Sequence, residues 1–269
     1  MPPLLEIKDL SVAFGGATAL SRAGFSVDDG SFTALVGESG SGKSVTALSI
    51  CRLLWKARVG GSALWAPPGA TARDLLRLPE ADLRAIRGGE ISYVFQDPAS
   101  SFNPLLTVGE QVGEAFRTHR GGSPAEVRQK ALRGLEEARI RDAERVYRSY
   151  PHELSGGLKQ RAMIAMALIA GPRLLVADEP TTALDVTTEA EILELLAEIR
   201  REKALTVLFI THDLPLAAAY AGRIVVMEKG RVVECMDKDG GGFRPGNAYT
   251  KRLFGVDLAR SVPKQRIGA

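Results

Sequence analysis

The sequence predicts an α/β fold with a mostly parallel central sheet. Short apolar runs of strand length alternate along the chain with longer segments that have the periodicity of helices. Four of these runs end in polar residues: Val36 before a glycine-rich loop, Phe95 before Gln96, Ala177 before Asp178-Glu179, and Ile210 before Thr211-His212. Because ligands bind beyond the carboxyl ends of parallel strands, we expect the four ends to meet at one edge of the sheet and to surround one ligand.

The composition is that of an ordinary globular protein. The chain has 269 residues, of which 45% are hydrophobic and 25% charged, and these values argue against disorder, a coiled coil or a collagen-like repeat. A net charge of +3 is too small to indicate nucleic acid as a partner. The two cysteines, Cys51 and Cys235, are too few for a disulfide scaffold or a four-thiolate metal centre, and they favour a reducing compartment.

Nothing in the sequence predicts a segment that crosses a membrane. The longest apolar run, residues 162–170, is well short of the ~20 residues that a spanning helix needs. The N-terminal residues, Met1-Pro2-Pro3, are not a basic region followed by an apolar stretch, so we expect no secretory signal. We therefore expect a cytosolic protein, which would serve a membrane only from its surface.

The N-terminal part of the chain is expected to form short strands around one helix. Apolar positions predict strands over residues 4–14 and 32–36, with a shorter strand at 25–27 that ends in the turn residues Asp28-Asp29-Gly30. A helical pattern then runs from Lys43 to about Leu54.

The middle of the chain is expected to be mostly helical. Residues 60–90 are loop-like, and a strand follows over residues 91–95. Residues 105–153 lack the alternation of strands and carry many arginines and glutamates at helical spacing, which predicts a helical lobe. Residues 155–170 are expected to form a buried helix, because they are apolar nearly all round, and Gly171-Pro172 ends it.

Further strands and one amphipathic helix are expected in the C-terminal part. Residues 174–177 and 206–211 have the length and composition of buried strands. Asp185 is a candidate N-cap for the helix between them. Residues 223–227 and 231–235 flank Lys229-Gly230 as a hairpin, and the tail that follows is first glycine-rich and then basic.

The glycine-rich loop has the pattern of a phosphate-binding site. Residues 37–44 read Gly-Glu-Ser-Gly-Ser-Gly-Lys-Ser and fit G-x-x-x-x-G-K-[ST], between an apolar strand and a helix. In this motif backbone N–H groups surround phosphate oxygens, the lysine neutralises the β and γ phosphates, and the final hydroxyl binds Mg²⁺. The candidate nucleotide-binding residues here are Gly37, Glu38, Ser39, Gly40, Ser41, Gly42, Lys43, Ser44 and Val45.

A second acidic element follows the strand at residues 174–177. Asp178, at the carboxyl end of this strand, has the oxygen ligands that hydrated Mg²⁺ prefers. Glu179 beside it could orient and polarise an attacking water. An ordinary solvated strand end remains the alternative for this motif when it is taken alone.

The sequence Leu154-Ser155-Gly156-Gly157, followed by Gln160-Arg161, resembles the signature of ABC-transporter ATPase subunits. The motifs also follow that family's order: the glycine loop, Gln96, the signature, Asp178-Glu179-Pro180, Ala183-Leu184-Asp185 and His212. The resemblance covers nearly the whole chain and implies the P-loop NTPase fold of ABC ATPases, with an N-terminal antiparallel β subdomain and a helical lobe. It implies one domain over residues 1–269, with a core at 1–104 and 173–235, a helical lobe at 105–172 and a tail at 236–269.

The resemblance also implies roles for single residues. Glu179 would be the general base, and His212 would hold the γ-phosphate and the water, while Lys43 binds the phosphates. Gln96 would contact Mg²⁺ or the water, and the metal would be held with Ser44 and Asp178. The signature residues Ser155, Gly156 and Gly157 would contact ATP held by a second subunit, with Asp185 at the dimer interface and Phe14 stacked on adenine.

Finer details resemble one branch, the ATPases of oligopeptide, dipeptide and nickel importers. They are Phe95-Gln96-Asp97-Pro98, Phe102-Asn103-Pro104-Leu105, the Tyr150-Pro151-His152-Glu153 that precedes the signature, and Tyr249-Thr250-Lys251. There are also departures: Leu158 replaces the usual Gln or Met, and Asn247-Ala248 replaces His-Pro. The C-terminal cysteine cluster of many peptide importers is missing from the sequence, which tilts the expectation toward nickel or metallophore systems.

The resemblance implies ATP and Mg²⁺ as cofactors and several protein partners. These are membrane permease subunits, a second ATPase subunit and an extracytoplasmic substrate-binding protein. We expect the second ATPase subunit to differ from this one, and a second copy of this chain is the alternative. The expected location is the cytoplasmic face of the membrane, with no nucleic acid bound. Two alternatives stay open at this point: an ABC-type ATPase that acts on nucleic acid or ribosomes, and a P-loop kinase of small molecules.

Overall fold

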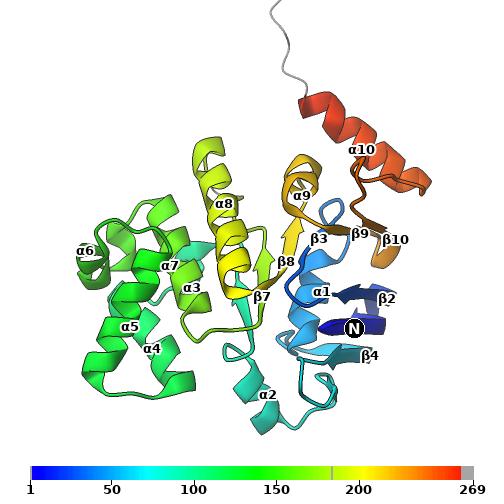
Figure 1. The fold of residues 1–269 in the computed structure, drawn as a ribbon. Helices are drawn as coiled ribbons and strands as arrows, with labels where there is room; N and C mark the ends of the chain where they lie inside the picture. Colours follow the sequence, from blue (N-terminus) through cyan, green and yellow to red (C-terminus); the bar gives the residue numbers. More distant parts are fainter. Residues whose placement is uncertain (1, 183, 262–269) are drawn as a thin grey trace, which may run out of the picture. The chain divides into compact units, whose positions relative to one another are not determined.

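The computed structural model describes residues 2–182 and 184–261, and the chain divides into two compact units (Figure 1). The first unit comprises Met1–Leu76 and Phe209–Ala269, and the second comprises Arg77–Leu208. Within the described ranges, no helix has the length and apolar character needed to span a bilayer.

The first unit begins with an antiparallel sheet. β1 (Leu5–Phe14) pairs with β2 (Ala17–Val27) on one side and with β4 (Ala57–Trp65) on the other, and β5 (Arg73–Asp74) extends the order to β2-β1-β4-β5. The inward side chains of β1, such as Leu5 and Leu10, are fully buried. The expected N-terminal antiparallel subdomain is therefore confirmed.

The prediction that residues 60–90 are loop-like is wrong. β4 and β5 lie partly in this range, and so does α2 (Glu80–Ile86). The glycine pair Gly60-Gly61 disguised the strand, because glycine normally weakens a strand. Gly61 is required there: its φ is +96°, and an added Cβ would lie 2.6 Å from the carbonyl oxygens of Lys8 and Asp9, at an irregularity of β1.

The first unit also holds the strands that carry the glycine-rich loop. β3 (Phe32–Val36) pairs in parallel with β9 (Arg223–Glu228), which forms the predicted antiparallel hairpin with β10 (Arg231–Asp237). The order is β10-β9-β3-β8, and β8 (Thr206–Thr211) enters this unit with its last residues, 209–211. All five side chains of β3 are buried, as its apolar run predicts.

The helices of this unit differ from expectation in two places. α1 (Lys43–Ile50) ends four residues before Leu54, because the chain turns at Arg52, whose φ is +54°. The tail carries α10 (Ala248–Ser261), which its glycine-rich and basic composition did not predict. α9 (Leu214–Tyr220) follows β8 and is capped by Asp213.

The second unit contains parallel strands and the predicted helical lobe. β6 (Ile91–Val94) and β7 (Leu174–Asp178) are parallel, with Val94 opposite Ala177, and the order here is β8-β7-β6. The remaining elements are α3 (Pro98–Ser101), α4 (Val108–Arg120), α5 (Pro124–Glu137), α6 (Ala143–Arg148), a 3₁₀ turn (Pro151–Glu153), α7 (Gly156–Leu168) and α8 (Val186–Lys203). The prediction of an α/β fold with a mostly parallel sheet is confirmed.

Local sequence explains where the lobe helices begin. Thr107 and Ser123 form capping boxes with Glu110 and Glu126, so each helix start has its backbone N–H groups satisfied by side chains. Six of the thirteen residues of α7 are buried, all between Gln160 and Ala167, so the helix is buried over its C-terminal half rather than along its whole length as predicted.

Candidate functional site

The phosphate loop connects β3 to α1 in the first unit. Lys43 is almost completely buried, and its ammonium group donates hydrogen bonds to the carbonyl oxygens of Gly37 (2.7 Å) and Glu38 (3.0 Å). The lysine therefore lies against the loop, as the sequence motif requires. Ser44, the next residue, begins the exposed side of α1.

The backbone of the loop requires glycine at two positions. An added Cβ on Gly37 would lie 2.2 Å from the carbonyl oxygen of Met227, and one on Gly42 would lie 2.5 Å from Cδ2 of Leu20. Both residues also have positive φ, +153° and +104°. The motif's glycines are thus explained by close approach of the neighbouring chain.

The loop also fits an anionic ligand. No side chain caps the N-terminus of α1 at Gly42. The hydroxyl of Ser41 is buried and has no hydrogen-bond partner among the described residues. A helix N-terminus without a side-chain cap, beside a buried ammonium group, suits phosphate oxygens.

Two residues from the far end of the chain brace this loop. The N–H of Gly230, in the β9–β10 turn, donates to the carbonyl oxygen of Ser41 (2.9 Å). The N–H of Glu38 donates to the hydroxyl of Tyr249, at the start of α10 (3.3 Å). Sequence reasoning did not assign either residue to the site, because nothing in a local motif indicates which distant segment packs on it.

Two other predicted residues lie in the first unit. Phe14 ends β1, just before the Gly15–Gly16 turn, and its side chain is half-buried. His212 follows β8, and its side chain is exposed. Its neighbour Asp213 is held by two hydrogen bonds, in which its N–H donates to Thr211 Oγ1 and its carboxylate accepts from the N–H of Leu216.

The second unit brings together Gln96 and Glu179. They follow the parallel strands β6 and β7, and Gln96 Nε2 donates to Glu179 Oε2 at 3.0 Å. Thr182 Oγ1 donates to the same carboxylate oxygen at 2.9 Å. The predicted meeting of strand ends is therefore confirmed for this pair, and Thr182 is a contact that the sequence analysis missed.

Glu179 also has a strained backbone. Its φ is +44°, in the left-handed region that residues other than glycine rarely adopt. Such strain persists where surrounding contacts fix the residue, and it is concentrated at functional sites. Asp178, the last residue of β7, is half-buried beside it.

The signature residues begin α7 in the same unit. Ser155 caps the helix by accepting a hydrogen bond from the N–H of Leu158 (3.4 Å), and Ser155 and Gly156 are exposed. An added Cβ on Gly157 would lie 3.0 Å from Cγ2 of Thr188, in the first turn of α8. The glycines thus let the signature approach the start of α8 closely.

Asp185 caps α8, as predicted. Its carboxylate accepts hydrogen bonds from the N–H groups of Thr187 and Thr188 (both 3.1 Å) and from the hydroxyl of Thr188 (2.7 Å). The hydrogen bond from the Thr188 hydroxyl is the largest of the effects that lower the pKa of Asp185. Of the motif Ala183-Leu184-Asp185, Ala183 lies outside the described residues.

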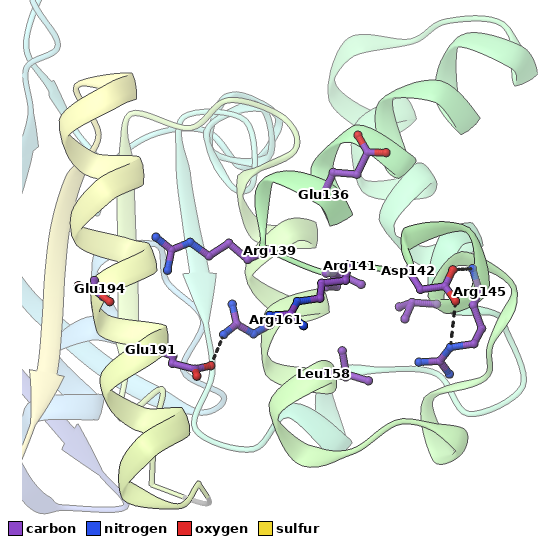
Figure 2. Close-up of a pocket in the computed structure, with 11 residues that line it drawn as sticks. Glu136, Arg139, Arg141, Asp142, Arg145, Leu158, Arg161, Glu191 and Glu194 are labelled. Atoms are coloured by element: carbon purple, nitrogen blue, oxygen red, sulfur yellow. Dashed lines mark hydrogen bonds and ion pairs between the residues drawn. The ribbon is translucent and has the colours of Figure 1, made fainter.

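Arg161 connects the signature helix to its neighbours. Figure 2 shows its guanidinium reaching Glu191 of α8, at 2.7 Å, and it also donates to the carbonyl oxygen of Ala138. The hollow in this figure is lined by four arginines and four carboxylates: Arg139, Arg141, Arg145, Arg161, Glu136, Asp142, Glu191 and Glu194. Their formal charges cancel, so these side chains give the hollow no excess charge for an ionic ligand.

Comparisons with known proteins place the chain in a family. The model of the ABC transporter family matches residues 20–182, which is more than half of the chain. The chain is 47% identical over 268 residues to the peptidoglycan transport ATP-binding protein YejF of Agrobacterium fabrum, covering 97% of this chain and 48% of that protein. It is 46% identical over 272 residues to a probable peptide ABC transporter ATP-binding protein of Sinorhizobium fredii, covering 98% of this chain and 78% of the relative.

A solved structure agrees with these relatives. The dimeric ATP-binding cassette MJ0796, in a post-hydrolysis state bound to ADP and Pi, matches with a TM-score of 0.76 and 31% identity, covering 88% of this chain and 99% of the other. The chain belongs to the ABC transporters. It is an ABC ATPase, and the relatives named above are ATP-binding proteins of peptide and peptidoglycan transport.

Membership in this family decides between the classes left open by the sequence. The nucleic-acid or ribosome ATPase and the small-molecule kinase are not supported, whereas the transporter subunit is. The two relatives are named for peptides and peptidoglycan, and they give the nickel alternative no specific support.

Proposed function

We propose that this chain binds ATP at its phosphate loop, and that hydrolysis of this ATP drives peptide import through a membrane permease. The observation that carries this proposal is the pair Gln96–Glu179, in which the carboxylate of a residue with a strained backbone is held just after the carboxyl ends of two parallel strands. The buried Lys43, at a helix start without a side-chain cap, supplies the phosphate-binding group.

The phosphate loop of this site would bind the triphosphate. Backbone N–H groups from Gly40 to Val45 would surround the phosphates, and Lys43 would exchange its two carbonyl partners for β- and γ-phosphate oxygens. The hydroxyl of Ser44 and the carboxylate of Asp178, with Gln96, have the oxygen ligands that Mg²⁺ prefers. When bound, the ion would neutralise charge that develops on the phosphates.

The acidic and signature residues would then complete catalysis. Glu179 would act as general base toward water, with its orientation fixed by Gln96 and Thr182. His212 would hold the γ-phosphate, and Phe14 would stack on adenine. The exposed N-terminus of α7, at Ser155, would contact ATP held by a second subunit, with Asp185 near the interface.

The partners follow from this assignment. We expect the whole chain to act as one ATPase domain, paired with a second ATPase subunit of different sequence, under permease subunits at the cytoplasmic face of a membrane. An extracytoplasmic binding protein would deliver the cargo. The names of the relatives favour peptides as that cargo.

The substitution Glu179→Gln tests the assignment of the base. The amide keeps an oxygen that can accept from Gln96 and Thr182 but cannot take a proton, so we expect steady-state ATPase activity to fall about 10²- to 10⁴-fold with ATP affinity unchanged. Glu202→Gln removes the same charge from an exposed position of α8 and should keep full activity. Normal ATPase activity in the Glu179→Gln variant would remove Glu179 from this role.

A further inference from the structure

The segment before and at the start of α10 is fixed to the hairpin strand β10. The carboxylate of Glu234 accepts hydrogen bonds from the N–H groups of Gly246 (2.6 Å) and Asn247 (3.2 Å). Asn247 Oδ1 in turn accepts from the N–H of Tyr249 at 2.8 Å. Tyr249 and Thr250 are both buried, so the first turn of this helix is seated in the first unit.

Tyr249 carries this anchoring into the phosphate loop. Its hydroxyl accepts a hydrogen bond from the N–H of Glu38, a residue 211 positions earlier in the chain. The carbonyl oxygen of Glu38 accepts hydrogen bonds from Lys43 Nζ (3.0 Å) and from the N–H of Ser41 (3.1 Å). Glu38 therefore has its N–H held by Tyr249 and its carbonyl in contact with the ammonium group that is to bind phosphate.

The loop needs such an anchor because it is rich in glycine. Gly37, immediately before Glu38, has a φ of +153°, and Gly40, two residues after Glu38, has a φ of +79°. Glycines add conformational freedom that must be given up when a ligand is bound. A hydrogen bond from the backbone N–H of Glu38 to the buried side chain of Tyr249 restricts that freedom before the ligand arrives.

We propose that Tyr249 is a positioning residue of the ATP site: its hydroxyl fixes the peptide group between Gly37 and Glu38, whose carbonyl oxygen accepts from Lys43, and thereby pre-orients Lys43 for the phosphates. This inference rests on the proposed function of the phosphate loop. Tyr249 touches no phosphate itself and acts through the loop. Its loss therefore weakens ATP binding and leaves the chemical step at saturating ATP nearly unchanged.

The variant Tyr249→Phe isolates the hydroxyl, because it keeps the buried ring. A single neutral hydrogen bond corresponds to about a two- to tenfold effect, so Kd for ATP and KM should rise by this factor, with kcat within about twofold of the original. Tyr147→Phe is the matched control: this tyrosine lies in the second unit under the guanidinium of Arg128, and its variant should bind ATP like the original protein. Unchanged Kd in the Tyr249→Phe variant would overturn the proposal.

A double-mutant cycle with Lys43→Ala separates positioning from simple packing. If Tyr249 acts through the lysine, Tyr249→Phe should have little further effect on Kd for a fluorescent ATP analogue once the lysine is gone. The same factor in both backgrounds would show that the hydroxyl acts independently of Lys43, and the proposal would then be wrong. If Lys43→Ala alone leaves Kd unchanged, the assignment of the phosphate loop itself fails and this inference falls with it.

Discussion

Replacing Gly37 with alanine should destabilise the protein more than replacing Gly40, although both lie in the same loop. Both glycines have positive φ, so alanine costs about 1–3 kcal/mol of backbone strain at either position. Only at Gly37 does the added Cβ also meet the main chain, 2.2 Å from the carbonyl oxygen of Met227 and 2.7 Å from the Ser41 hydroxyl. At Gly40 the space around the new methyl group is open.

The difference between the two variants can be estimated from this contact. Overpacking that forces backbone to move costs about 1–3 kcal/mol, so the free energy of unfolding of Gly37→Ala should lie lower than that of Gly40→Ala by this amount. Thermal unfolding should report it as a Tm about 2–12 °C lower, since 1 kcal/mol shifts Tm by about 2–4 °C in proteins close to this size. Equal Tm values would mean that the neighbouring strand yields without cost, and the close-approach explanation of Gly37 would be wrong.

Two further predictions concern helix starts in the second unit. Ser155→Ala and Ser123→Ala each remove a helix cap and should each lower the free energy of unfolding by about 1 kcal/mol. Only Ser155→Ala should lower ATPase activity, and equal activity in the two variants would contradict the role of the signature. Hydrogen bonds from Thr107 and Ser123 lower the folded-state pKa of Glu110 and Glu126 below their ordinary 4.5. The two carboxylates therefore contribute their full stabilisation to the folded protein above pH 4.5, and this contribution is lost as the pH falls through the lowered pKa values. The free energy of unfolding, measured with urea, should therefore fall less steeply with decreasing pH below 4.5 in a variant with both Glu110→Gln and Glu126→Gln than in the original protein. Identical slopes in the two proteins would show that these two carboxylates do not cause the pH dependence.

Strands and helices with regular periodicity could be predicted from the sequence. The five buried residues of β3 and the six of β8 form short apolar runs, and Ser155 and Asp185 are capping residues directly before helices. These features are local, because a cap or an apolar run is visible within a few residues. The helix α10 was missed because the glycines and basic residues of the tail hide its helical pattern.

The candidate site also contains residues that a local motif predicts and contacts that no local motif predicts. The phosphate loop and the carboxylate at Glu179 follow from motifs of adjacent residues, and the structure brings Gln96 to that carboxylate as parallel strands require. The contacts of Glu38 with Tyr249 and of Ser41 with Gly230 could not be predicted, since they join segments about two hundred residues apart. Spacing along a single sequence contains no signal for such pairs.

The long separation of these contacts has a consequence for biosynthesis. A ribosome releases the chain from its N-terminus, so the phosphate loop leaves the exit tunnel long before its two braces do. The β9–β10 turn reaches the loop only when Gly230 has emerged, and the tyrosine hydroxyl arrives later still. Nascent chains halted before residue 249 should therefore have a phosphate loop that lacks part of its hydrogen bonds. Such chains should bind nucleotide more weakly than the full-length protein, so full ATP affinity should be reached only late in translation.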